Sequence, residues 1–411
     1  MTGYLKSDTI NMIFSLYLEE FKMTEKLFDD GKLYEFDAKV MSCTEVKKGY
    51  EVVLDRSAFF PEGGGQAADE GTVNGIKVLD VQEKNGEVIH KLAGKLEVGE
   101  KVHGVVDGKV RLRRMQNHSG EHILSGLIHA RFGYNNVGFH MGSSEITLDL
   151  DGPLTAEDLA SCELAANEAV AADVPITISY PDAETLKTLD YRSKLDMIDN
   201  VRIVTIQGYD VCACCAPHVS SSGQIGIIKV LGFESYKGGT RVHMLCGLDA
   251  LEDYNKKLNS VTAISQALSA KQDKITDAVK KLFDENGALK KKCADFQREH
   301  VAKIIADMKA EHEGQNCENL CVFTQNIDSN GMREIANAGA EIADVLFGVF
   351  GGNDDDGYSY IMSSKTVKLR EKARDINSTL NGKGGGSDTM IQGSVKSKAE
   401  DIKGFFGSFK G

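Results

Sequence analysis

The chain has 411 residues, 41% of them hydrophobic and 27% charged, with only 5 prolines. This composition excludes a disordered or fibrous protein, and the length predicts two or three folded domains. The formal net charge of −13 excludes attraction of nucleic acid by the molecule as a whole, so such contacts would depend on local basic patches. No apolar run reaches the roughly 18 residues of a membrane span, and we therefore expect no membrane segment.

The N-terminal part of the sequence predicts a small β-barrel. Residues 1–22 are interpreted as an N-terminal extension without a function of its own, because Met23 opens a second start-like run. Short β-runs broken by glycine follow at residues 36–40, 50–54, 71–78 and 101–106. Such runs, with turn residues between them, are typical of an all-β unit. We expect a barrel domain over residues 23–108.

The middle of the chain predicts an α+β domain over residues 109–248. Helical patterns occupy residues 116–131 and 156–171. β-rich runs follow at residues 176–180, 201–206, 224–230 and 241–245. Thr155 is the expected N-cap of the second helix, since Asp158 stands three residues later and completes a capping pattern.

A seven-residue apolar repeat follows this domain. Its apolar positions are Val261, Leu268, Ile275, Leu282, Leu289 and Phe296. This repeat predicts a long helical linker over residues 249–315 that packs against a neighbouring helix, with Gly287 as a place where the helix breaks. The repeat also permits a homodimer through the C-terminal half.

The last hundred residues alternate again between the two kinds of secondary structure. Strands are expected near residues 320–323, 345–349 and 358–362, helices near 333–344 and 367–379, and a glycine-rich loop at 382–386. Together these elements predict a third, α/β domain over residues 316–411.

Two pairs of potential metal ligands stand out. His118 and His122 lie four residues apart in a predicted helix, so that both imidazoles project from one face. Cys214 and His218 repeat this spacing, and Pro217 indicates a loop there. Three imidazoles and one thiolate form a tetrahedral donor set suited to zinc.

The choice of the thiolate is open from the sequence. Cys212 and Cys215 are alternatives, and the spacing to His218 favours Cys214. The clustering of three of the nine cysteines at residues 212–215 indicates a reducing compartment rather than a disulfide framework, and we therefore expect a cytoplasmic location.

The segment from His118 to His122 also fits the inverted zinc peptidase pattern, in which Glu121 would be the general base. Such peptidases use a carboxylate as their third ligand and keep a coordination position for water. Cys214 and His218 would fill that shell here, which favours a different chemistry.

Four blocks of the sequence resemble the editing domain of alanyl-tRNA synthetase, and more closely the free-standing alanyl-tRNA editing proteins of the AlaX type, long form. They are residues 60–66 (FPEGGGQ) with Asp69 behind them, residues 114–122, residues 214–218 and residues 384–393. The resemblance implies an α+β protein with an N-terminal β-barrel, a zinc-bearing editing domain, a helical linker and a C-terminal DHH-associated domain. The N-terminal part is too short and too β-rich for the synthetase's charging module, so editing in trans is expected.

The resemblance also implies a reaction, the hydrolysis of tRNA(Ala) charged with serine, with glycine as a second candidate. Gln66 and Glu121 are the expected catalytic residues. Gly63, Gly64, Gly65 and Ser143 are expected to bind the substrate, with zinc held by His118, His122, Cys214 and His218. Whether zinc activates water or organises the pocket is open. The chain departs from the family in having Glu121 where threonine is frequent and in ending the glycine block with Gln392-Gly393-Ser394.

Contacts to tRNA are expected from local features. Basic runs lie at residues 109–114, 237–241, 290–292 and 368–374. The candidate tRNA-binding residues are Arg114, Lys237, Arg241, Gly384, Gly385 and Gly386. An alternative function is a tRNA-binding adaptor in which zinc is purely structural and no hydrolysis occurs.

Overall fold

The computed structural model describes residues 23–142, 144–193 and 201–410. The chain divides into two compact units, Met1–Val261 and Thr262–Gly411, and each is described by itself. No helix among the described residues is long and apolar enough to cross a membrane.

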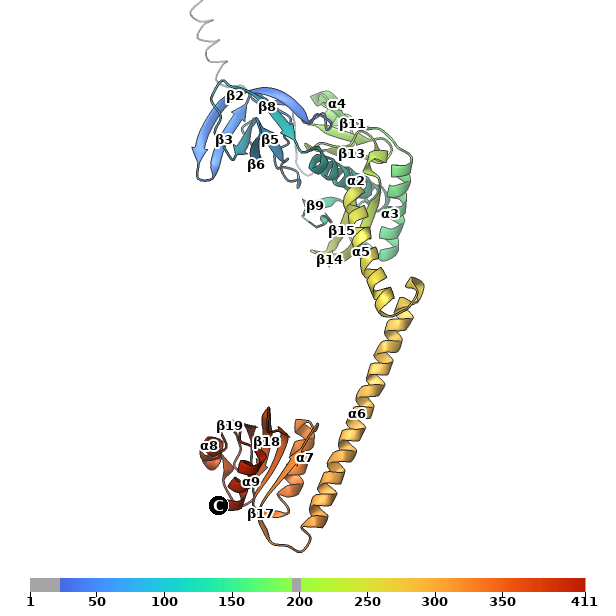
Figure 1. Cartoon of the computed structure of the whole chain (residues 1–411). Helices are drawn as coiled ribbons and strands as arrows, with labels where there is room; N and C mark the ends of the chain where they lie inside the picture. Colours follow the sequence, from blue (N-terminus) through green and yellow to red (C-terminus); the bar gives the residue numbers. More distant parts are fainter. Residues whose placement is uncertain (1–22, 143, 194–200, 411) are drawn as a thin grey trace, which may run out of the picture. The chain divides into compact units, whose positions relative to one another are not determined.

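The first unit begins with the predicted barrel, whose strands run from blue to cyan in Figure 1. Six strands close it in the order β2-β3-β7-β6-β5-β8. Their bounds are β2 Glu35–Val46, β3 Gly49–Leu54, β5 Gly71–Val73, β6 Ile76–Lys84, β7 Glu87–Leu92 and β8 Lys101–Val106. Side chains alternate strictly between exposed and buried along β8, because successive residues of a strand point to opposite faces. The short strands β1 (Glu25–Lys26) and β4 (Arg56–Ser57) pair beside the barrel.

The second part of this unit is built around the helix α2 (Gly108–Phe132). Asp107 caps this helix, and the helix therefore starts eight residues before the predicted one. The basic run at residues 109–114, taken as a charged patch, is its first part. From Met115 to Gly126 every residue of α2 is buried, which places its polar side chains inside the protein.

Two sheets and further helices accompany α2 in the described part of this unit. A four-stranded sheet runs β14-β15-β10-β9, and a three-stranded sheet runs β11-β12-β13. The strands are β9 Asn136–Met141, β10 Ile146–Leu150, β11 Ile176–Ser179, β12 Ile203–Ile206, β13 Asp210–Ala213, β14 Ile228–Tyr236 and β15 Gly239–Cys246. The helices are α3 (Ala156–Ala171), whose Thr155–Asp158 capping box is confirmed, and α4 (Ala183–Thr188). The strand predicted at residues 224–230 begins only at Ile228, after the 3-10 turn η1 (Ser222–Ile225).

The predicted long helix is interrupted, but not at Gly287. The helix α5 (Gly247–Ala267) ends before Ser269, which has a left-handed backbone with φ of 49°. A 3-10 turn, η2 (Gln272–Lys274), then leads into α6 (Ile275–Glu311), and Gly287 lies inside α6. The prediction at Gly287 was wrong because a helix tolerates one glycine at a cost of about 1 kcal/mol.

The second unit is a five-stranded sheet of order β16-β17-β18-β20-β19, drawn in orange and red in Figure 1. Its elements are β16 Cys317–Thr324, α7 Ser329–Gly339, β17 Ala343–Asn353, β18 Gly357–Ser363, α8 Leu369–Thr379, β19 Gly382–Gly386, β20 Met390–Val395 and α9 Ala399–Ser408. The C-terminal end of α6 packs here through Val301 and Met308. The helix predicted at 333–344 lies earlier, because Asp328 caps α7 and the chain enters β17 at Ala343.

The glycine-rich loop predicted at residues 382–386 is the strand β19. It pairs with β20 at very close range. A Cβ atom on Gly384 would lie 2.4 Å from the carbonyl oxygen of Gln392 and 2.5 Å from the Tyr360 hydroxyl. Gly384 therefore permits β19 to approach its neighbours closely. The prediction of a loop was wrong because it rested on glycine content alone, whereas the backbone here is paired in a sheet.

Candidate metal centre

The four predicted metal ligands come together in the first unit. His118 and His122 project from one face of α2, and Cys214 and His218 come from the loop after β13. One potential ligand atom from each of the four lies within 4.8 Å of the others. The Cys214 Sγ is 3.5 Å from His118 Nε2 and 3.4 Å from His218 Nε2. The two pairs thus place their donor atoms around one position, with one pair on α2 and the other on the loop after β13.

Each of the three imidazoles has a partner at Nδ1. His118 Nδ1 lies 2.8 Å from Gln66 Oε1 and donates to it. His122 Nδ1 lies 2.8 Å from Asp210 Oδ2, and His218 Nδ1 lies 3.0 Å from Ser119 Oγ. A proton held at Nδ1 leaves the Nε2 lone pair free, as a metal ligand requires. The donor set therefore fits a soft divalent ion such as zinc in both chemistry and orientation.

The electrostatics favour a thiolate at Cys214. Burial alone would raise the pKa of this thiol, but the neighbouring His118 and His218 hold it well below its usual range. Burial lowers the pKa of His218 to about 3, against the opposing effect of Cys214. Burial would also lower the pKa of His122, but its hydrogen bonds to Asp210 and Cys212 raise it well above its ordinary value.

The neighbouring cysteines are placed differently. Cys215 is exposed and faces the glycine turn, where a Cβ on Gly64 would lie 3.6 Å from its sulfur. Cys212 lies near His122 and Asp210, in a second group of potential ligands. The geometry thus favours Cys214 as the thiolate that meets all three imidazoles.

Two residues behind His122 had no signal in the sequence. Asp210 accepts two hydrogen bonds from Arg192, at 2.7 and 2.9 Å, in addition to the one from His122. Arg192 also donates to Ser125 Oγ at 2.8 Å. Burial would raise the pKa of Asp210, but its hydrogen bonds to His122 and Arg192 lower it. A charged carboxylate therefore orients His122, and only folding brings these residues together.

The glycine block forms a tight turn beside the candidate metal ligands. Gly63 and Gln66 exchange both backbone hydrogen bonds, and Gly64 and Gly65 have φ of 59° and 82°. Left-handed backbone at both central positions favours glycine. A Cβ on Gly65 would lie 2.4 Å from the carbonyl oxygen of Phe139. The glycines thus let the turn come close to β9 and aim Gln66 at the ligands.

Gln66 is held at one end and free at the other. Its side chain is 1% exposed, and its Oε1 accepts from His118. Its Nε2 is buried and has no hydrogen-bond partner among the described residues. An unpaired buried donor is costly, and such a donor next to a candidate site is available for an acceptor atom of a substrate.

The other predicted substrate residues have mixed outcomes. Glu121 is 3% exposed, and its Oε1 accepts from Asn136 Nδ2 at 2.7 Å. Its carboxylate belongs to neither group of potential metal ligands found among the described residues. Ser143 lies outside the described residues.

The predicted tRNA-binding residues differ in how strongly contacts within the chain hold their side chains. Arg114 donates to the Ala68 carbonyl oxygen and to Glu70, which ties α2 to the barrel. Arg241 forms two hydrogen bonds to Asp149 and stacks 3.7 Å over the Tyr236 ring. Lys237 lies at the β14–β15 turn, 5.0 Å from the same ring. The three glycines belong to β19 in the second unit.

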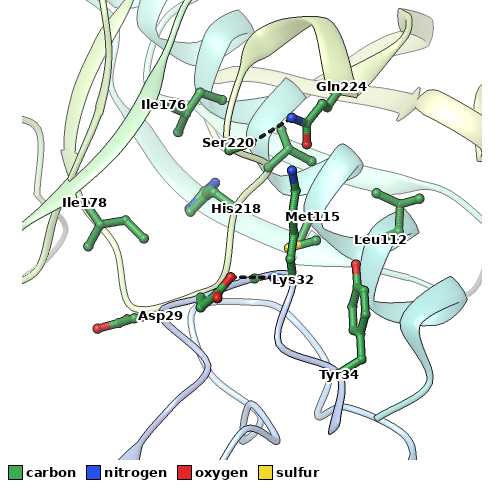
Figure 2. A pocket seen from close by; sticks show the side chains of 13 residues that line it. Asp29, Lys32, Tyr34, Leu112, Met115, Ile176, Ile178, His218, Ser220 and Gln224 are labelled. Carbon is green, nitrogen blue, oxygen red and sulfur yellow. Dashed lines mark hydrogen bonds between the residues drawn. The ribbon is translucent and has the colours of Figure 1, made fainter.

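A cavity of about 200 Å³ lies behind His218. Its apolar part includes Leu112 and Met115 of α2 and Ile176 and Ile178. Figure 2 shows Asp29, Lys32 and Tyr34, from the segment before the barrel, around this same cavity. The N-terminal segment therefore comes close to the loop that carries His218.

Three known families match separate parts of the chain. The family of class II (A) tRNA synthetases matches residues 4–110, the threonyl and alanyl tRNA synthetase second additional domain matches residues 201–243, and the DHHA1 domain matches residues 318–409. The last match confirms the predicted C-terminal domain type. The described part of the first match contains the closed barrel.

Whole proteins match over most of the chain. The alanyl-tRNA editing protein AlaX-L of Pyrococcus horikoshii is 29% identical, over 92% of this chain and 96% of that protein. The alanyl-tRNA editing protein Aarsd1 of Danio rerio is 28% identical, over 90% of this chain and 93% of that protein. The alanine-tRNA ligase of Halorubrum lacusprofundi is 31% identical over 82% of this chain but only 38% of its own length.

Proposed function

We propose that this chain, which belongs to the alanyl-tRNA editing proteins, hydrolyses the ester that links serine to tRNA(Ala), with glycine as a second substrate. The observation that carries the proposal is Gln66, whose Oε1 is bound to His118 while its buried Nε2 has no partner among the described residues. The site thus combines a zinc-type donor set with a free, oriented hydrogen-bond donor.

The need to distinguish serine from alanine explains why a polar site suits this substrate. A synthetase pocket for alanine cannot strongly reject serine, which adds one hydroxyl, and separates such pairs by a factor of roughly 10². A second site that hydrogen-bonds the hydroxyl rejects alanine, because alanine would leave buried polar groups unpaired. Glu121, buried and held by Asn136, supplies such a group in our proposal.

The chemistry requires that water add to the ester carbonyl and that the bond to the ribose oxygen break. A zinc ion held by His118, His122, Cys214 and His218 would supply a fixed positive charge that polarises or orders polar groups in the pocket. Gln66 Nε2 donates to the oxygen on which negative charge develops, and a single such donor typically contributes 10²–10³ in rate. The Gly63–Gln66 turn holds that donor in place.

A Gln66→Glu variant tests this role and separates the enzyme from an adaptor. Glutamate keeps an acceptor for His118 but removes the N–H donor. We expect zinc to be retained and the deacylation rate of seryl-tRNA(Ala) to fall about 10²–10³-fold. The matched control is Gln207→Glu, since Gln207 is exposed in the turn before β13. A binding adaptor would show no catalysed deacylation in any of the three proteins.

The peptidase alternative makes a different prediction for Glu121. All four donors at the proposed zinc position are histidine or cysteine, whereas a peptidase of this pattern uses a carboxylate ligand. We expect no peptide cleavage by the wild type and full zinc retention in Glu121→Gln. Peptide cleavage that disappears in this variant would support the peptidase instead.

For tRNA, we propose that Lys237 contacts a phosphate group and that Arg241, which Asp149 holds beside Tyr236, supports this contact. Lys237 is exposed and its ammonium group lies over a tyrosine ring, which suits contact with a nucleic-acid backbone. Arg114 and the glycines of β19 are held by contacts within the chain, so we propose for them only a supporting role.

We also propose that α6 pairs with α6 of a second copy. Leu282, Leu289 and Phe296 are 53%, 60% and 70% exposed, and they occupy one position of the heptad. Asn286 and Cys293 occupy the other core position, where a single asparagine favours a parallel dimer. In that register Glu285 of one helix faces Lys290 of the other, which gives opposite charges across the seam.

Cysteine cross-linking tests the dimer. In a parallel pair the two Cys293 side chains face each other, so mild oxidation should produce a reducible dimer on an electrophoresis gel. In the control, Cys293→Ser with Lys291→Cys, the cysteine lies on the outer face and should cross-link far less. Equal cross-linking in both proteins, or a monomer in sedimentation, would contradict the pairing.

A further inference from the structure

We propose that Arg202 is a positioning residue that, with Asp29, shapes the ligand loop, residues 214–218, so that Cys214 and His218 reach the metal. The inference rests on the proposed zinc site and concerns residues that neither the sequence patterns nor the family resemblance pointed to. Arg202 lies just before β12 and is 8% exposed.

Arg202 holds the ligand loop by three hydrogen bonds. Its Nη1 donates to the carbonyl oxygen of Cys214 at 2.7 Å and to that of Ala216 at 3.0 Å. Its own carbonyl oxygen accepts from the Cys214 N–H at 3.1 Å. The carbonyl groups of Cys214 and Ala216 therefore point to the same nitrogen of Arg202. This arrangement bends the backbone between Cys214 and His218.

Asp29 provides the countercharge. Arg202 Nε donates to Asp29 Oδ1 at 2.7 Å, and the Tyr180 hydroxyl donates to Asp29 Oδ2 at 2.6 Å. Burial and the hydrogen bond to Asp29 raise the pKa of Tyr180 to about 12, so that this hydroxyl stays a donor. A buried guanidinium without its carboxylate is strongly unfavourable. The segment before the barrel, seen beside His218 in Figure 2, thus helps to fix the ligand loop.

The surroundings explain why the loop needs such support. The loop has no regular secondary structure of its own. Ala216 is fully buried in the barrel core, and the His218 carbonyl lies against Gly31. The loop is therefore pinned at Ala216, and Arg202 sets how its backbone turns on either side. Lysine could not replace Arg202, because one ammonium group lacks the planar fork that reaches both carbonyls and Asp29.

The test is zinc affinity in Arg202→Lys and Asp29→Asn, measured by competition with a chromogenic chelator, together with the visible spectrum after Co²⁺ loading. Loss of a supporting partner typically weakens metal binding 10–100-fold. We expect a loss of this size in Arg202→Lys, a smaller loss in Asp29→Asn, and a weakened thiolate-to-cobalt band in both. Arg113→Lys is the matched control, since Arg113 also bridges two acceptors, Asp249 and Glu252.

The outcomes separate this inference from the proposed function. Unchanged zinc affinity and cobalt spectrum in folded Arg202→Lys would overturn the inference, as would a wild-type protein that binds no zinc. An equal loss in Arg113→Lys would overturn it too, because the effect would then be general destabilisation. Wild-type protein that binds zinc but does not deacylate would contradict only the proposed function.

Discussion

Replacing Cys214 by serine is expected to remove bound zinc and to reduce deacylation of seryl-tRNA(Ala) to the uncatalysed rate. The Cys214 sulfur is the atom on which His118 and His218 converge, at 3.5 and 3.4 Å. A serine hydroxyl stays protonated and is a poor ligand for a soft ion. Metal analysis should find about one zinc per wild-type chain and almost none in the variant.

The control is Cys215→Ser, which changes the adjacent residue. Cys215 is exposed and faces the glycine turn, so this variant should keep its zinc. Zinc loss in Cys215→Ser, with retention in Cys214→Ser, would show that the ligand assignment is wrong.

Replacing Asp69 by asparagine is expected to lower the free energy of unfolding by about 3–5 kcal/mol, the usual effect of breaking a buried ion pair. Asp69 and Arg111 pair with fully buried side chains. Asp69 also accepts from the Phe60 N–H at 2.6 Å, and Arg111 donates to the Ala58 carbonyl. The pair thus joins α2 to the barrel loop that carries Gln66. Urea denaturation followed by circular dichroism measures the loss.

A double variant, Asp69→Leu with Arg111→Met, provides the control. Removing both charges avoids an unpaired buried guanidinium, so much of the stability should return. A single Asp69→Asn variant as stable as the wild type would mean that the pair does not fasten α2 to the barrel.

The group of candidate metal ligands was predictable because its geometry is local within each pair. A spacing of four residues on a helix places His118 and His122 on one face whatever the rest of the chain does. The same spacing pointed to the second pair, Cys214 and His218, and the resemblance to editing proteins added Gln66. The partners that orient the ligands, Asp210 and Arg202, could not be predicted, because only the folded sheets bring them to the site.

The errors have similar physical origins. A basic run also reveals cations but not their partners, and the structure shows that Glu70 binds Arg114 and Asp149 binds Arg241. A high glycine content does not distinguish a loop from a strand such as β19, whose glycines let neighbouring elements pack closely against it. A heptad repeat continues in the sequence across Ser269, where the backbone leaves the helix.

The most direct test of the account is the deacylation rate of seryl-tRNA(Ala) beside that of alanyl-tRNA(Ala), with the wild type and Cys214→Ala. We expect the wild type to remove serine rapidly and to leave alanine in place, and we expect no catalysis by the variant. Wild-type protein that leaves seryl-tRNA(Ala) at its spontaneous rate of hydrolysis, or that removes alanine equally fast, would contradict this expectation.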